Sequence, residues 1–369
     1  MGLRSNTARI LLECNFRCPF CFAAWHDDKE KPVLGEGRNL SPSKDWNRRL
    51  EKMRSQGYER VAFSGGEPTM HPNFIPLVRR AKELGFQSIE LQTNGSLLTR
   101  KNAEKIAQAG VTDALVSLHS HRERLFDKIT VTEGVFTTVV EGIRFLIAQG
   151  INVMISHVVI ETNVKDLVEF VRFCHREFPG MREILFFSMQ PEARGEKNMH
   201  LWPRLPDVRQ TLAPAMDECI RLGVGFRMDS QVGFPMCFVG GHEHRVDLVD
   251  VTKPHETFGE DLSSFRVIER KKVKLPQCES CFFEPSCYGF WEDYFTLFGL
   301  EGIEPVERTE ALDQYFPGLA DVWDGREARP ELISVRKRGQ KTKLTPEVAT
   351  ALPLPWKEGR ASIKERRKK

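Results

Sequence analysis

Short apolar runs alternate with helical patterns over the first half of the chain. Between the runs, apolar residues recur every three or four positions, as at Val164, Leu167 and Val171. Glycine or proline follows each helical segment, as is usual at helix ends. We therefore expect strands at 10–12, 61–63, 88–91, 114–118, 153–155 and 184–187, and helices at 46–55, 74–84, 102–109, 135–148 and 164–177.

This alternation predicts an α/β fold in which parallel strands are joined by right-handed crossovers and the sheet curls into an open barrel. Chemistry in such barrels lies at the carboxyl ends of the strands. After Pro191 the pattern loosens to one helix at 208–222, a glycine-rich stretch and a cysteine-rich segment. We expect a barrel at 1–190, a small cysteine-rich C-terminal lobe at 191–325 and a tail at 326–369.

Composition and charge exclude several classes of protein. With 369 residues, of which 40% are hydrophobic and 28% charged, the chain can bury a full core. It has no apolar run long enough to span a membrane, and its first ten residues lack the apolar centre of a signal peptide, so we expect a cytoplasmic protein. The tail carries 14 Lys and Arg against 5 Glu. We interpret it as a solvated extension, and nucleic acid binding is not indicated.

Nine cysteines in a cytoplasmic chain favour metal binding or catalysis over disulfides. Cys174 and Cys219 lie on apolar helical stripes and are expected in the core. The other seven form two groups, namely Cys14, Cys18 and Cys21, and Cys237, Cys278, Cys281 and Cys287.

The first group places three thiolates within eight residues. Three thiolates can bind three irons of a cubane and leave the fourth iron open, whereas a structural metal site normally has four protein ligands. An open iron can take a substrate or cofactor, which favours catalysis. A zinc knuckle is the alternative interpretation.

Two motifs carry a resemblance to a known family. The spacing Cys14-x-x-x-Cys18-x-x-Cys21, with Phe20 before the third cysteine, resembles the signature of radical S-adenosylmethionine (SAM) enzymes, and Ser64-Gly65-Gly66-Glu67-Pro68 resembles their second motif. The resemblance covers about residues 7–190. It implies a partial (β/α)6 TIM-type barrel and a [4Fe-4S] cluster whose fourth iron is chelated by SAM. Reductive cleavage of SAM then yields a 5′-deoxyadenosyl radical that abstracts hydrogen from the substrate.

The same resemblance implies further SAM contacts. Gly65 and Gly66 allow close backbone approach, and Glu67 supplies an acceptor for an ammonium group. The ribose is expected near Thr93 and Asn94, and other parts of SAM near Ser117 and His119.

One position departs from the family pattern. Related sequences often have Arg-Gly where this chain has Thr130-Val131, so an arginine contact to the SAM carboxylate is missing there. Arg122 and Arg124 are candidate replacements, or they are ordinary surface arginines.

The second cysteine group resembles the SPASM and Twitch extensions that hold auxiliary clusters. Cys278, Cys281 and Cys287, with Cys237 upstream, offer four thiolates, fewer than a two-cluster SPASM domain needs, so we expect one Twitch-like cluster. A four-cysteine zinc ribbon is the alternative. His242 or His244 could take the place of Cys237.

The family resemblance leads us to expect an enzyme that modifies a ribosomally made peptide or protein, using a reductant such as flavodoxin or ferredoxin. A separate peptide-recognition protein is expected because no such domain precedes the barrel. The alternatives are oxidation or rearrangement of a small-molecule intermediate and, outside enzymes, a metal-binding or electron-carrier protein. No residue is singled out as a general base.

Overall fold

The computed structural model describes residues 3–22, 43–229, 234–243, 246–247, 272–287, 289–299 and 302–328. The chain divides into two compact units, Met1–Arg266 and Val267–Lys369. Most of the expected tail, from residue 329 onward, and His244 lie outside the described residues. Within these ranges no helix is both long enough and apolar enough to cross a membrane.

The first unit is built on one parallel sheet. Each strand pairs with the next one in the chain, so every connection is a crossover and the expected α/β class is confirmed. The strands are β1 (Ser5–Leu11), β2 (Arg60–Gly65), β3 (Ser88–Thr93), β4 (Asp113–Ser117), β5 (Asn152–Val159), β6 (Glu183–Ser188), β7 (Gly225–Asp229) and β8 (Val246–Asp247).

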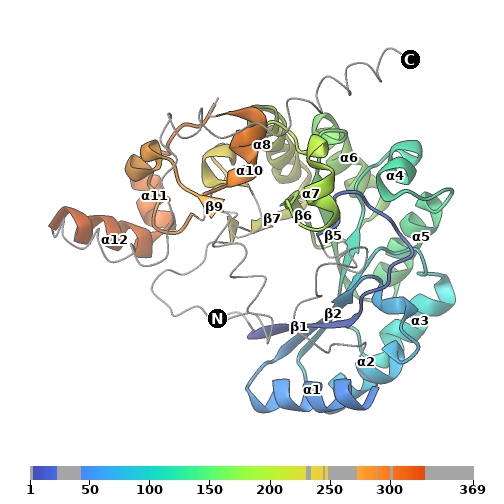
Figure 1. The fold of residues 1–369 in the computed structure, drawn as a ribbon. Helices are drawn as coiled ribbons and strands as arrows, with labels where there is room; N and C mark the ends of the chain where they lie inside the picture. The colour runs from blue at the N-terminus through green and yellow to red at the C-terminus, as the bar shows by residue number, and fades with distance from the viewer. Residues whose placement is uncertain are drawn as a thin grey trace. The chain divides into compact units, whose positions relative to one another are not determined.

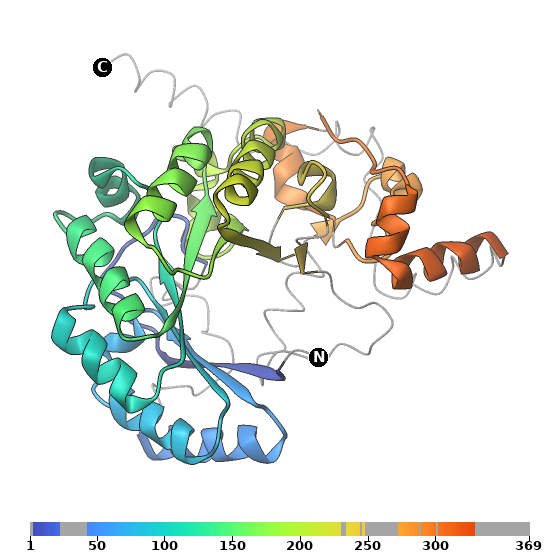
Figure 2. The same ribbon diagram turned by 180° about the vertical axis from the view of Figure 1, so that it is seen from behind.

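Helices cover one face of the curved sheet, which gives the expected partial barrel (Figures 1 and 2). The helices of the first unit are α1 (Ser43–Ser55), α2 (Phe74–Glu83), α3 (Arg100–Ala109), α4 (Glu123–Thr130), α5 (Phe136–Ala148), α6 (Leu167–Glu177), α7 (Arg194–Lys197) and α8 (Leu205–Leu222). The expected core cysteines, Cys174 on α6 and Cys219 on α8, are fully buried there. The short helices α4 and α7 were not expected.

The sheet is longer than the sequence predicts. Six strands ending near residue 190 were expected, but β7 and β8 extend the same sheet, and α8 belongs to this unit. In β7 the buried side chains of Phe226 and Met228 alternate with Gly225 and Arg227 over only five residues. So short an alternation is a weak strand signal in a single sequence.

The two faces of the sheet differ in exposure. On the helix-covered face, the Phe63 ring meets Phe74 of α2, and His157 stacks on Phe170 of α6. On the opposite, inner face, alternate residues of β3 to β6 are only half-buried toward the carboxyl ends of the strands, including Gln92, Leu115, Ser117, Ser156, Val158, Leu185 and Phe187. These half-buried side chains leave part of the inner face accessible to a substrate.

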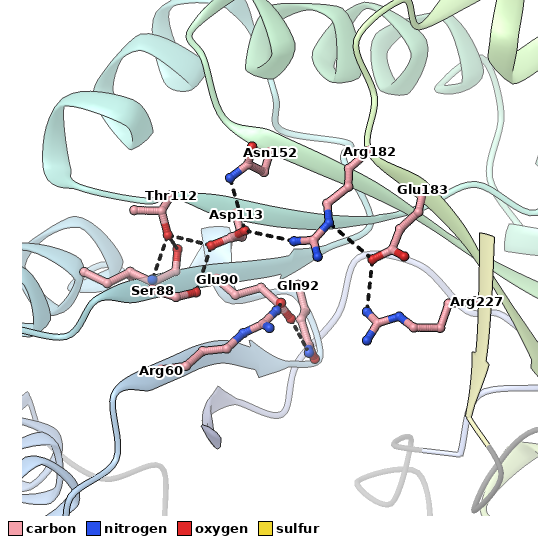
Figure 3. A network of polar contacts seen from close by, with 11 residues as sticks. Arg60, Ser88, Glu90, Gln92, Thr112, Asp113, Asn152, Arg182, Glu183 and Arg227 are labelled. Carbon is pink, nitrogen blue, oxygen red and sulfur yellow. Dashed lines mark hydrogen bonds and ion pairs between the residues drawn. The ribbon is translucent and has the colours of Figure 1, made fainter. Parts of the chain in front are cut away.

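Ion pairs close the amino-terminal end of this inner face (Figure 3). Arg60 pairs with Glu90, and Arg227 Nη2 lies 3.1 Å from Glu183 Oε1. Arg182 lies between Glu183 and Asp113, at 3.6 and 4.0 Å. Three arginines therefore face three carboxylates, and the network is balanced in charge.

The second unit is small and rich in turns. The two-residue strands β9 (Lys272–Val273) and β10 (Phe290–Trp291) pair antiparallel and flank the second cysteine segment. The 3-10 helix η7 (Pro276–Ser280) contains Cys278, and α10 (Glu292–Phe298), α11 (Glu310–Tyr315) and α12 (Pro317–Ala328) follow the segment. The Trp323 indole Nε1 of α12 donates to the Phe282 carbonyl at 2.7 Å, which ties α12 to the cysteine segment.

Candidate active site

The first cysteine group occupies the loop that follows β1. A turn, with Cys21 N donating to Cys18 O at 3.2 Å, brings the last two cysteines together, and all three are half-buried. Desolvation raises the pKa of Cys14 and raises that of Cys18 strongly, and the neighbouring Cys21 and Cys14 add to the Cys18 shift. Metal coordination reverses this effect, because it binds the thiolate.

The donor set fits a cubane. Cys14 Sγ accepts hydrogen bonds from Phe16 N at 3.4 Å and from Asn94 Nδ2 at 3.6 Å. Such donors stabilise thiolate charge. Over the described ranges, no three His, Cys, Asp or Glu side chains are grouped to bind a single metal ion. A cubane does not require such a group, since each thiolate binds a different iron.

Gly65 and Gly66 lie where the end of β2 meets the strand leading to Cys14. Gly66 N donates to Leu11 O at 2.6 Å, and Glu67 N donates to Glu13 O at 2.8 Å. A Cβ atom at Gly65 would lie 1.9 Å from Leu11 O, and one at Gly66 2.1 Å from Glu13 O. These glycines are therefore needed for backbone packing that positions the cysteine loop.

The Glu67 side chain is held by the protein, and its expected contact with the SAM ammonium group stays a prediction. It is fully buried, and its carboxylate accepts from Thr69 N at 3.0 Å, Thr93 Oγ1 at 2.8 Å and Asn94 N at 2.7 Å, as well as from the Thr69 hydroxyl. Desolvation raises its pKa against these donors. Three of these donors reach Oε1 and one reaches Oε2, so Glu67 joins the ends of β2 and β3.

Thr93 ends β3 and Asn94 follows it; the two are 4% and 7% exposed. Thr93 Oγ1 donates to Glu67 and accepts from Gly95 N at 3.1 Å. Asn94 bonds to the cysteine loop through Asn15 Oδ1 at 2.8 Å, besides its contact with Cys14. Both side chains thus have protein partners. Their expected contact with the SAM ribose stays a prediction.

Phe20, within the cysteine loop, contacts His119, which follows β4. Their rings meet edge to face, with centroids 4.9 Å apart, and His119 Nδ1 accepts from Val158 N at 3.2 Å. Desolvation and the nearby His157 lower the pKa of His119 to about 3, so it is neutral at physiological pH. Ser64 and Ser117 lie at the ends of β2 and β4 and are half-buried.

The missing arginine has no simple replacement in α4. Arg122 pairs with Asp166, and Arg124 is exposed, as expected of surface arginines. Thr130 is buried with its hydroxyl on Phe126 O at 2.8 Å, and Thr130 O accepts from Arg17 N of the cysteine loop at 3.0 Å. Val131, the C-cap of α4, takes the left-handed conformation, with φ 54°.

The segment around α7 is a contact that the sequence did not reveal. Arg194 N donates to Cys21 O at 3.2 Å, and Asn198 Nδ2 donates to Pro19 O at 3.1 Å. The Arg194 charge also lowers the pKa of Cys14 and Cys18, against the larger effect of burial. This segment was assigned to the C-terminal lobe, yet it belongs to the first unit and helps hold the cysteine loop.

Three cysteines of the second group lie close together in the second unit. Cys281 N donates to Cys278 O at 3.1 Å, Val306 N to Cys281 Sγ at 3.4 Å, and Gly289 N to Cys287 Sγ at 3.3 Å. Desolvation, with smaller effects from Cys287 and Cys281, raises the pKa of Cys278 to about 11. The pattern of turns with N–H donors to sulfur suits a metal or iron–sulfur ligand set.

Cys237 belongs to the first unit, on the 3-10 helix η5 (Met236–Phe238), and is half-buried. His242, the alternative ligand, has its Nε2 on Asp217 Oδ1 at 2.9 Å. The expected fourth ligand therefore stays a prediction from the sequence.

Sequence comparison matches most of the first unit to a known family. Residues 10–174 match the model of the radical SAM superfamily. Relatives named "Probable GTP 3′,8-cyclase" are 26% identical over 206 residues in Sulfurisphaera tokodaii and 32% identical over 184 residues in Saccharolobus solfataricus. These alignments cover 56% and 50% of this chain and only 62% and 56% of the relatives.

Solved structures agree on the fold. Streptococcus suis SuiB bound to its precursor peptide SuiA has a TM-score of 0.53 and 17% identity, over 83% of this chain and 75% of SuiB. Native anSMEcpe with bound AdoMet and the Kp18Cys peptide has a TM-score of 0.54 and 15% identity, over 87% and 99%. The family implies a [4Fe-4S] cluster and SAM as cofactors. Residues 10–174 thus form a radical SAM domain, the domain that defines this superfamily.

Proposed function

We propose that Cys14, Cys18 and Cys21 hold a [4Fe-4S] cluster whose remaining iron binds SAM, and that the enzyme modifies a peptide or protein. The observation that carries the first part is the packing of the Gly65–Glu67 and Thr93–Asn94 segments against the cysteine loop at one end of the sheet. When bound, cluster and SAM supply a 5′-deoxyadenosyl radical that removes hydrogen from the substrate.

The residues around the proposed cluster hold the cysteine loop in place. The backbone of Gly65 and Gly66 holds the cysteine loop against β2, and buried Glu67 keeps β3 beside it. His119 stays neutral, so it adds no charge beside the loop. The half-buried residues Ser64 and Ser117 are proposed to contact polar parts of SAM.

The inner face of the sheet favours a substrate with little negative charge. Toward its carboxyl end the half-buried strand residues are mostly apolar or hydroxylated, among them Leu115, Ser156, Leu185 and Phe187. A nucleoside triphosphate needs several cations, usually Arg or Lys. Among the described inner-face strand residues, Arg60 and Arg227 are paired with carboxylates.

This charge distribution separates two candidate substrates. SuiB and anSMEcpe are solved with peptides, whereas the relatives in sequence are named for GTP. The mostly neutral inner face supports a peptide. A separate peptide-recognition protein and a flavodoxin or ferredoxin reductant complete the proposal.

The second unit is proposed to hold an auxiliary iron–sulfur cluster on Cys278, Cys281 and Cys287. Its support is the two backbone N–H groups that donate to the sulfurs of Cys281 and Cys287. Both of these thiols also lie near enough to Cys278 to raise its pKa. Zinc is the competing ligand, because cysteine turns with the same spacing bind it equally well. Metal analysis separates the two.

The substrate proposal is tested by following hydrogen transfer. Reconstituted protein receives SAM, dithionite and either GTP or a pool of synthetic peptides deuterated at Cα and Cβ, and 5′-deoxyadenosine is analysed by mass spectrometry. We expect deuterium in 5′-deoxyadenosine with peptides and no cyclised product from GTP. GTP turnover without deuterium transfer from any peptide would contradict the substrate class. The Cys18→Ala variant should form no 5′-deoxyadenosine, whereas Cys219→Ala, which changes a core cysteine, should still form it.

A further inference from the structure

We propose that Asn94 tunes the first cluster: its side-chain amide donates to the Cys14 sulfur and raises the reduction potential of the cluster bound there. The inference rests on the proposed function, because it needs a cluster on Cys14. It gives Asn94 a positioning and electronic role that differs from the ribose contact implied by the family resemblance.

The orientation of the Asn94 amide is set by its neighbours. Asn94 Oδ1 accepts from Ser96 N at 2.9 Å and from Ser96 Oγ at 2.7 Å. The other end, Nδ2, donates to Asn15 Oδ1 at 2.8 Å and faces Cys14 Sγ at 3.6 Å. Reversing the amide would place its oxygen against Asn15 Oδ1 and lose the contact with Ser96 N, so the nitrogen must face the sulfur.

The backbone of Asn94 is fixed as well as its side chain. Its backbone N donates to Glu67 Oε2 at 2.7 Å, and Glu67 is fully buried. Asn15 Nδ2 donates to Ser96 Oγ at 2.8 Å, which closes a small ring of hydrogen bonds around the amide. Because Asn94 is 7% exposed, water competes little for its N–H group.

A donor at this sulfur has a predictable electronic effect. Hydrogen bonds to cluster sulfurs stabilise the more negative, reduced state and so raise the reduction potential. Cys14 receives two such donors, Phe16 N and Asn94 Nδ2. A side-chain substitution can remove only the Asn94 donor. If Asn94 served only to join the two loops, it would not need an N–H group directed at the sulfur.

The test is an anaerobic redox titration of the holoenzyme without SAM, followed by electron paramagnetic resonance (EPR). The first cluster is recognised by the change in its signal when SAM is added afterwards. At the wild-type midpoint, we expect Asn94→Ala to lower the ratio of reduced to oxidised cluster several-fold; a tenfold change corresponds to 59 mV for one electron. Asn94→Asp, which keeps the shape but replaces the donor with a carboxylate, should lower the ratio further.

Ser96→Ala is the matched control, since it removes hydroxyl contacts of the same ring and leaves the Asn94 donor in place. It should titrate like the wild type. An unchanged potential in both Asn94 variants would overturn the inference, as would weaker SAM binding without a shift in the SAM-free potential, which is the signature of a ribose contact. A wild-type protein that assembles no [4Fe-4S] cluster would instead refute the proposed function.

Discussion

The two cysteine groups are held in different ways. The loop of Cys14, Cys18 and Cys21 is fastened by segments distant in sequence, namely those around Gly66, Asn94, Thr130 and Arg194. In the segment of Cys278, Cys281 and Cys287, most contacts come from turns within a dozen residues, with Val306 and Trp323 added from outside.

This difference shows which site depends on the barrel. The first site exists only when several strand ends are assembled, so a change in any of them should reach the cysteines. The second site is specified mainly by its own segment, as in small metal-binding modules whose ligand spacing is local. Loss of the first site should therefore leave the second largely intact.

Gly66→Ala should have the largest effect. The added Cβ would lie 2.1 Å from Glu13 O, so the strand that leads to Cys14 must move. We expect loss of about four irons, one cubane, per reconstituted chain, with iron retained at the second group. Gly318→Ala, where a Cβ meets nothing within 4 Å, is the control. Full iron content in Gly66→Ala would show that the loop does not depend on this contact.

Acid should weaken the first unit more than the second. Burial lowers the pKa of His119 to about 3 and of His157 to about 4, so the unfolded chain binds protons that the folded chain does not. Stability is full above the unfolded pKa of about 6.5 and declines as pH falls toward 4, by up to about 1.4 kcal/mol per pH unit for each histidine.

Urea unfolding of wild type and His157→Phe at pH 7 and pH 5 measures this slope. The aromatic replacement keeps the stack on Phe170 and removes one titrating group. The variant should lose less stability between the two pH values. Equal losses would mean that His157 is not the acid-sensitive group.

Val131→Gly should stabilise the end of α4 beside the cysteine loop. A β-branched residue with φ 54° is strained, by about 1 to 2 kcal/mol, and glycine adopts this conformation freely. We expect the free energy of unfolding, measured by chemical denaturation, to rise by about 1 kcal/mol. The gain is smaller than the relieved strain because glycine loses more backbone entropy on folding. Val135→Gly, at the right-handed N-cap of α5, is the control and should not stabilise.

Trp323→Phe should have the smallest effect and touch only the second unit. It removes the hydrogen bond from the indole to Phe282 O but keeps an aromatic ring, at a loss of about 1 kcal/mol. Hydrogen exchange should rise in the segment around Phe282 and stay unchanged at residues 14–21. Faster exchange in both segments would argue against independent cysteine sites.

Most of the barrel could be predicted from the sequence, because its strands and helices follow strong periodicity. The six expected strands and the helices α1, α2, α3, α5, α6 and α8 are confirmed. Strand β7 and helix α7 were missed because five and four residues carry too little periodic signal.

The site was predictable in its residues but not in its contacts. Motif spacing singled out Glu67 and Asn94, yet only the fold shows that the Glu67 carboxylate accepts four hydrogen bonds and that Asn94 faces Cys14. The contact of Arg194 and Asn198 with the cysteine loop joins positions more than 170 residues apart, and no local pattern encodes it.

The most direct test of two separate cysteine sites is a variant in which Cys14, Cys18 and Cys21 are all changed to Ala. Iron, zinc and sulfide content and 5′-deoxyadenosine formation are measured after anaerobic reconstitution. The account predicts that the variant forms no 5′-deoxyadenosine and keeps the iron of the second group, about four per chain for one cubane. Continued 5′-deoxyadenosine formation, or complete loss of iron, would contradict it.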